Sequence, residues 1–345
     1  MSSDAAPDQH ATPEQHVQRA QLLADLGRYD DAAIELGFAI ALDPHRGEAY
    51  TLLARVHLAA GRPADALAAT DAAIATTGVD TAALGARAMA LVDLRRFGEA
   101  ADVAHEILRL GSADAEAQCL GAAILAEARN GQPALDAAWR AVQLAPDQAQ
   151  THLVLGLVAA RLELFQLAER AYREALELDP ELADARHDIG VIKLEQRRYA
   201  EALEHLAEAA VMRPANPAAG RAVGNGLRRV LHLGAGYSFI APALVACLAL
   251  NGGAGSRLFA LLVGAAGLIV LGVFASRLPG KVTAALRPLM RSDRALAVAV
   301  VAVVAGPCLV LLYALVGTPW PLALAVGAGA VALLANVLAD FRVRP

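Results

Sequence analysis

The chain has 345 residues, of which 57% are hydrophobic and only 4% aromatic, and its formal net charge is −5. The charge is unevenly distributed. Residues 1–216 carry 19 Lys and Arg against 33 Asp and Glu, whereas residues 217–345 carry 11 against 2. An acidic first part argues against non-specific nucleic-acid binding, which needs a basic face to displace counterions. The asymmetry indicates two parts in different environments.

The first residues, 1–12, are polar and lack the basic and apolar segments of a signal peptide, so we expect a disordered lead-in. Cys119, Cys247 and Cys308 are the only cysteines, and their spacing fits neither a zinc site nor a disulfide framework. We expect them to be small buried apolar residues in a reduced compartment.

Alanine recurs at a fixed interval of 34 residues. This column consists of Ala32, Ala66, Ala100, Ala134, Ala168 and Ala202. A second small-residue column keeps the same interval with Ala20, Ala54, Ala88, Ala122, Gly156 and Gly190. Helix breakers or turn formers end the repeats at Pro44, Gly78, Ser112, Pro146, Pro180 and Pro214. Such a period predicts an all-α stack of about six helical hairpins over residues 13–216, and it favours binding over catalysis.

These columns, the aromatic residues that follow several mid-repeat turns and the closing prolines resemble the tetratricopeptide repeat (TPR) family over residues 13–216. Two departures are visible: the large aromatic near the repeat start appears only as Tyr50, and repeats two and three lack the closing Pro. The resemblance implies a right-handed solenoid of 34-residue hairpins that binds protein partners.

In TPR proteins the first helix of each hairpin lines a concave groove, so the resemblance also implies a peptide-binding groove. The matching positions are Thr51, Arg55, Met89, Asp93, Leu153, Leu157, Arg161, His187 and Val191. The Lys and Asn set with which some family members clamp a chaperone tail is absent, so such a ligand is not expected. The alternative is that these residues pack inside a closed superhelix.

Residues 217–229 contain three glycines and are predicted to form a hinge or juxtamembrane linker. Four apolar stretches follow, at 230–250, 258–275, 295–316 and 320–339, and each has about the 17–25 residues that a membrane-spanning helix needs. We therefore predict a four-helix transmembrane domain over residues 230–345 with a basic loop at 276–294. The alternative is that the first stretch is interfacial or re-entrant.

Lys and Arg are concentrated in alternate flanks of these stretches, which predicts that both termini and the repeats lie in the cytoplasm. An Ala-rich composition with Arg favoured over Lys is typical of GC-rich bacterial genomes, so the inner membrane is the expected location. Basic residues in the 276–294 loop could contact anionic lipid: Arg277, Lys281, Arg287, Arg291 and Arg294. The alternative is a solvated loop.

The sequence contains no recognisable catalytic, metal-ligand or cofactor motif, so no enzyme activity, metal or cofactor is expected. The centres of the apolar stretches carry no charge, which argues against transport. We therefore predict a membrane-anchored cytoplasmic scaffold for protein–protein interaction. Its helical bundle could bind a membrane protein or a second copy, as an assembly or regulatory subunit. The alternative is a transporter or channel component that the repeats gate.

Overall fold

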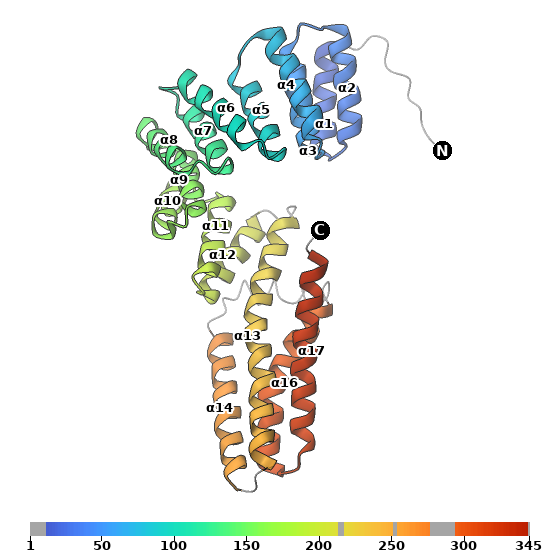
Figure 1. Cartoon of the computed structure of the whole chain (residues 1–345), viewed down its shortest axis with the longest axis vertical. Helices are drawn as coiled ribbons and strands as arrows, with labels where there is room; N and C mark the ends of the chain where they lie inside the picture. The colour runs from blue at the N-terminus through green and yellow to red at the C-terminus, as the bar shows by residue number, and fades with distance from the viewer. Residues whose placement is uncertain (1–11, 213–216, 251–253, 277–293, 344–345) are drawn as a thin grey trace, which may run out of the picture. The chain divides into compact units, whose positions relative to one another are not determined.

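The computed structural model describes residues 12–212, 217–250, 254–276 and 294–343 (Figure 1). The regular structure within these ranges is α-helical, as predicted. The chain divides into two compact units, Met1–Pro180 and Glu181–Pro345. Each unit is described separately below.

The first unit is a series of antiparallel helical hairpins, and consecutive helices pair in the order of the sequence (Figure 1). The described helices are α1 (Pro13–Asp25), α2 (Tyr29–Leu42), α3 (Gly47–Ala59), α4 (Pro63–Thr77), α5 (Thr81–Asp93), α6 (Phe97–Leu110), α7 (Ala115–Glu127), α8 (Gly131–Leu144), α9 (Ala149–Arg161) and α10 (Phe165–Leu178). The first helix of each hairpin has 13 residues, and successive first helices begin 34 residues apart, as the repeat period predicts.

The small-residue columns lie where the two helices of a hairpin meet. Ala20 and Ala32 in the first hairpin, and Ala122 and Ala134 in the fourth, are completely buried. In the fifth hairpin Gly156 takes the small position, and the ring of Tyr172 packs directly over it. Small side chains at these positions let the paired helices approach closely, and larger neighbours fill the remaining space.

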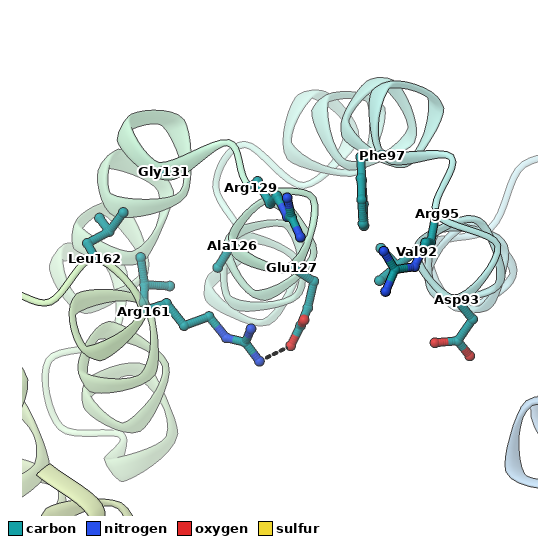
Figure 2. A pocket seen from close by; sticks show the side chains of 11 residues that line it. Val92, Asp93, Arg95, Phe97, Ala126, Glu127, Arg129, Gly131, Arg161 and Leu162 are labelled. Atoms are coloured by element: carbon teal, nitrogen blue, oxygen red, sulfur yellow. Dashed lines mark hydrogen bonds and ion pairs between the residues drawn. The ribbon is translucent and has the colours of Figure 1, made fainter. Parts of the chain in front are cut away.

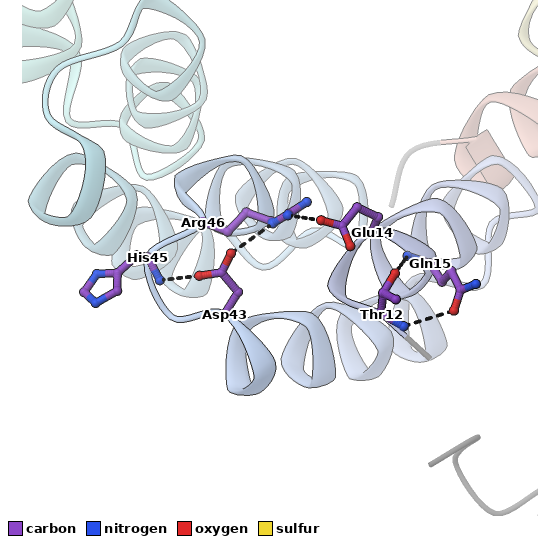
Figure 3. Close-up of polar contacts among 6 residues, drawn as sticks. All are labelled: Thr12, Glu14, Gln15, Asp43, His45 and Arg46. Atoms are coloured by element: carbon purple, nitrogen blue, oxygen red, sulfur yellow. Dashed lines mark hydrogen bonds and ion pairs between the residues drawn. The ribbon is translucent and has the colours of Figure 1, made fainter. Parts of the chain in front are cut away.

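The first helix starts with a capping box, and the next hairpin is tied to it (Figure 3). The Thr12 hydroxyl accepts a hydrogen bond from the backbone N–H of Gln15, while the Gln15 side chain accepts one from the backbone N–H of Thr12. The Arg46 guanidinium, just before α3, forms ion pairs with Glu14 and with Asp43. The connection between the first two hairpins is thus fixed at both ends.

The second unit contains the sixth hairpin and the apolar helices. The described helices are α11 (Ala183–Glu195), α12 (Tyr199–Met212), α13 (Pro217–Leu250), α14 (Ala254–Ser276), α16 (Arg294–Val316) and α17 (Trp320–Val343). Helix α12 packs on α13, and α13 packs on α16 and α17. Apolar residues of α12, α13 and α16 share one buried cluster, which is why the sixth hairpin belongs to the same compact unit as the apolar helices.

Residues 217–229, where we expected a linker, are the first turns of α13. The repeat period continues through them: α13 begins 34 residues after α11, and buried Gly224 continues the column that contains Gly190. An ion pair of 2.7 Å joins Arg229 to Glu195, again 34 residues apart. Position 226 is also glycine, and a methyl group there would lie 3.3 Å from Leu203 of α12. Gly226 thus lies in a helical segment and packs closely against α12.

Within the described residues, three helical segments are long and apolar enough to cross a membrane, rather than the four predicted. They are Gly226–Leu250, Gly255–Val273 and Leu296–Val316. The part of the apolar stretch of α17 whose side chains are described, Trp320–Val331, is shorter than these three segments. Most of the basic loop at 276–294, including Arg277, Lys281, Arg287 and Arg291, lies outside the described residues, as do residues 1–11 and the side chain of Arg294.

Small residues bring the apolar helices of the second unit together. A methyl group at Gly329 of α17 would lie 2.7 Å from the backbone oxygen of Ser238 in α13, and one at Gly306 of α16 would lie 2.7 Å from the Ser238 side chain. The buried Ser238 hydroxyl donates a 3.2 Å hydrogen bond to the carbonyl of Val303. The small residues at 306 and 329 therefore pack the bundle's own helices.

A pair of glycine substitutions tests the packing within the hairpins. Gly156→Ala would place a methyl group 2.6 Å from the buried Tyr172 ring, so we expect it to lower the free energy of unfolding by about 1–3 kcal/mol. Gly37→Ala, at an exposed helical position with open space around it, should instead raise it by about 0.5–1 kcal/mol. Denaturant unfolding followed by circular dichroism measures both. Equal shifts for the two variants would contradict this account.

Candidate functional site

The first helices of the third, fourth and fifth hairpins lie next to one another, because α5 contacts α7 and α7 contacts α9. One face of each helix carries residues at spacings of four, seven and eleven, which share a side of an α-helix. We call this surface the α5–α7–α9 strip. Its residues are Ala82, Met89 and Asp93 on α5, Glu116, Leu120, Ala123 and Glu127 on α7, and Gln150, Val154, Leu157 and Arg161 on α9. A cavity lies at each end of the strip.

The first cavity, of 640 Å³, is at the carboxyl ends of the three helices (Figure 2). Its charged lining consists of Asp93, Arg95, Glu127, Arg129 and Arg161. Apolar side chains, among them Val92, Phe97 and Leu162, complete the wall. Three arginines against two carboxylates give the cavity an excess of one positive charge in a part of the chain that is otherwise acidic.

Two of these arginines come from the tight turns that follow α5 and α7. Arg95 and Arg129 both have φ of 60°, the left-handed region, where the first two hairpins use Gly27 and Gly61. A left-handed conformation costs a residue with a Cβ about 1–2 kcal/mol. The turn requires this conformation because the helix closes with hydrogen bonds such as the 2.8 Å bond from Asn130 N to Leu125 O. The turn itself would accept glycine, so the arginines are kept at a cost in backbone energy.

The arginines of this cavity differ in their partners. Arg161 forms an ion pair with Glu127 (Figure 2). The Arg129 guanidinium lies over the ring of Phe97, 5.2 Å from its centre, which is the geometry of a cation–π contact. Among the described residues, Arg95 and Arg129 have no ion-pair partner, and neither does Asp93. The cavity thus offers two unpaired cationic groups beside an aromatic ring.

The second cavity, of 690 Å³, is at the amino ends of the same helices. Its charged lining is entirely acidic: Asp80, Asp114 and Glu116. The Asp114 carboxylate caps α7 by accepting hydrogen bonds from the backbone N–H groups of Glu116 and Ala117, at 3.1 and 3.3 Å. Cys119 lies in the wall of this cavity. Burial, with smaller contributions from the charges of Glu116 and Asp114, raises the pKa of its thiol to about 11.

The predicted groove residues are divided between the two units. Met89, Asp93, Leu157 and Arg161 lie on the strip, and Asp93 and Arg161 line the first cavity. Leu153 is half-buried on α9, next to the strip residue Val154 in the sequence.

The remaining predicted groove residues lie elsewhere. Thr51 and Arg55 lie on α3, and the Thr51 hydroxyl donates a 3.2 Å hydrogen bond to the carbonyl of Gly47, one helical turn earlier. His187 and Val191 lie on α11 in the second unit. A binding role for any of the nine residues stays a prediction.

Sequence reasoning missed Arg95, Glu127 and Arg129. A signal was available, because the turn position that is glycine in the first two hairpins changes to Arg, Arg, Glu and Arg in the next four. Arg95 and Arg129 lie at turn positions, outside the helix-face pattern, whereas Glu127 lies on the helix face in the column of Asp93 and Arg161. Within the described part of the chain, no group of three or more His, Cys, Asp or Glu side chains is arranged to hold a metal ion.

Comparison with protein families agrees with the repeat architecture. Two tetratricopeptide repeat models match, over residues 23–90 and 153–219. The chain therefore carries tetratricopeptide repeats within residues 23–219, and such repeats generally mediate protein–protein interaction and are typically non-catalytic. No curated protein sequence matches the chain.

Several solved structures are similar to this chain. TTC0263, a thermophilic TPR protein of Thermus thermophilus, is 23% identical, with 63% of this chain and 99% of that chain covered and a TM-score of 0.42. Yeast Tom70 is 18% identical, with 58% and 43% covered and a TM-score of 0.48. The Cut9–Hcn1 hetero-tetramer of APC/C is 17% identical, with 64% and 43% covered and a TM-score of 0.48. At these values the likeness is limited to the fold.

Replacing the residue at a left-handed turn with glycine should distinguish its effect on stability from its effect on partner binding. Arg95→Gly and Glu163→Gly each replace a residue with φ near 60°, so both should raise the free energy of unfolding by about 0.5–1 kcal/mol. Denaturant midpoints measure this. Only Arg95 lines the cavity, so only Arg95→Gly should also weaken binding at the strip, measured by co-purification. A loss of stability in both variants would contradict the backbone interpretation.

The raised pKa of the Cys119 thiol predicts that it reacts slowly with alkylating reagents. Relative to an ordinary cysteine of pKa 9.0, the thiolate fraction near pH 7.5 should be about 100-fold lower. We expect iodoacetamide to modify Cys119 at least that much more slowly in the folded protein than in urea, as followed by peptide mass spectrometry. Equal rates in both conditions would show that the thiol is neither buried nor perturbed.

Proposed function

We propose that the protein is a membrane-anchored scaffold whose α5–α7–α9 strip binds a segment of a partner protein. The observation that carries the proposal is the continuity of the strip. It joins two cavities of 640 and 690 Å³ through Met89, Ala123 and Leu157, and Met89 is 43% exposed at its centre. A surface with an apolar middle and a charged cavity at each end is suited to a helical or extended peptide segment.

Anchoring rests on the three apolar helical segments that are long enough to cross a membrane. Arg221, Arg228 and Arg229 lie before or at the start of the first of them. Positive flanks favour the cytoplasmic side, so we place the repeats in the cytoplasm. The predicted bacterial inner-membrane location, the lipid contacts of the 276–294 loop and a membrane-protein partner for the bundle stay predictions.

Charge substitution at the centre of the strip tests the function. Met89→Glu combined with Leu157→Glu places two carboxylates on the apolar middle without altering the hairpin interfaces, because one position is exposed and the other half-buried. Proteins that co-purify with the full chain in mild detergent, quantified by mass spectrometry, should fall at least tenfold, which corresponds to about 1.4 kcal/mol.

The matched control places the same charges on second helices. Leu144→Glu and Leu178→Glu alter residues that are 41% and 44% exposed at the ends of α8 and α10. This double variant should retain the same partners at native levels. If both double variants lose the same proteins, or if both retain them, the strip is not the binding surface.

A further inference from the structure

We propose that the α5–α7–α9 strip selects a segment with acidic side chains at one end and basic side chains at the other, and so fixes the direction in which it binds. This rests on the proposed function and specifies the class of partner. The basis is the opposite charge of the two cavities. Three arginines and two carboxylates, Asp93 and Glu127, line the first, which gives it a net charge of +1. Three carboxylates and no basic side chain line the second, which gives it a net charge of −3.

The charge distribution by itself assigns no ligand. Acidic residues at helix starts and basic residues at helix ends are what the helix dipole favours. Asp114 is explained in this way, because its carboxylate caps α7. The inference therefore depends on charged groups that form neither a helix cap nor an ion pair among the described residues.

The basic cavity provides such groups. Arg95 and Arg129 occupy left-handed turn positions that glycine fills in the first two hairpins, so the fold does not need them there. Among the described residues neither has an ion-pair partner, whereas the exposed arginines at the start and end of α6, Arg96 and Arg109, are paired with Glu99 and Glu106. Two unpaired guanidinium groups beside the Phe97 ring suit carboxylate side chains of a ligand.

The acidic cavity offers unpaired groups of the opposite charge. The carboxylates of Asp80 and Glu116 have no ion-pair partner within the described part of the chain, and no basic side chain lines this cavity. Between the two cavities the strip is apolar, with Met89, Ala123 and Leu157. A ligand that carries one kind of charge would be attracted to one cavity and repelled by the other. A segment with acidic side chains at one end and basic side chains at the other is attracted to both cavities.

The length of the strip sets the spacing of the charges. Each helix of the strip has 13 residues, and at 1.5 Å per residue this is about 20 Å from cavity to cavity. An extended chain covers about 20 Å with six residues. The charged groups of the partner segment should therefore be separated by about six residues in extended form, or by about 13 in a helix.

Synthetic peptides of about eight residues test the inference on the full chain in detergent at low salt. The first probe has two Glu at one end, two Lys at the other and apolar residues between, with both termini blocked. The second has the same composition with the charges alternating. We expect the first to bind about five- to tenfold more tightly by fluorescence anisotropy. A photo-crosslinker at its Glu end should label the turns around residues 95 and 129, and one at its Lys end should label residues 80–82 and 114–116.

Charge reversal provides the matched control. Arg95→Glu with Arg129→Glu should weaken the first peptide about tenfold. Arg96→Glu with Arg109→Glu changes the net charge equally but alters no residue of either cavity, so binding should stay within about twofold. Equal affinity for the two peptides, no binding of either, or crosslinks from both ends at both cavities would overturn the inference. The proposed function is tested separately by the Met89→Glu and Leu157→Glu double variant. If that variant loses its co-purifying proteins, the proposed function stands even when the peptide experiment fails.

Discussion

The close approach of two antiparallel helices is the constraint from which the rest of the repeat structure follows. Ala20 and Ala32 are completely buried where the helices of the first hairpin meet, and Gly156 lies under the Tyr172 ring in the fifth. A larger side chain at these positions would separate the helices and break the stack, since interiors are close-packed. With the hairpins held this closely, the first helices of successive hairpins lie side by side, and a continuous strip becomes available for binding.

The same compact geometry explains why charged groups gather at the ends of the strip. Each hairpin must reverse direction immediately after its first helix, which requires one residue in the left-handed region. Gly27 and Gly61 meet this requirement without strain, whereas Arg95 and Arg129 meet it at a cost and place their guanidinium groups at the rim of a cavity. Glu163 and Arg197 have the same left-handed φ at the corresponding turns, so the turn geometry is shared by four hairpins and only Arg95 and Arg129 carry it into the cavity.

The connection between the repeats and the apolar helices is also set by the repeat period. Helix α13 begins in register with the earlier first helices, and Glu195 pairs with Arg229 as Glu127 pairs with Arg161. The sixth hairpin packs on this helix and shares a buried cluster with α16. Within the second unit, the last repeat and the first apolar helix are therefore joined by packed side chains as well as by the chain itself.

The sequence by itself determined the all-α class, the 34-residue hairpins, their small-residue interfaces and the apolar character of the C-terminal part, because each depends on local periodicity or composition. It also picked out Met89, Asp93, Leu157 and Arg161 on the helix faces that form the strip. Only the tertiary structure decided that the glycine-containing segment at 217–229 is helical, since glycine serves tight packing as readily as flexibility. Within the described residues it also gave three helical segments, rather than four, that are long and apolar enough to cross a membrane. Finally, it assembled Arg95, Glu127 and Arg129 into one cavity, because residues 34 apart become neighbours only when the hairpins stack.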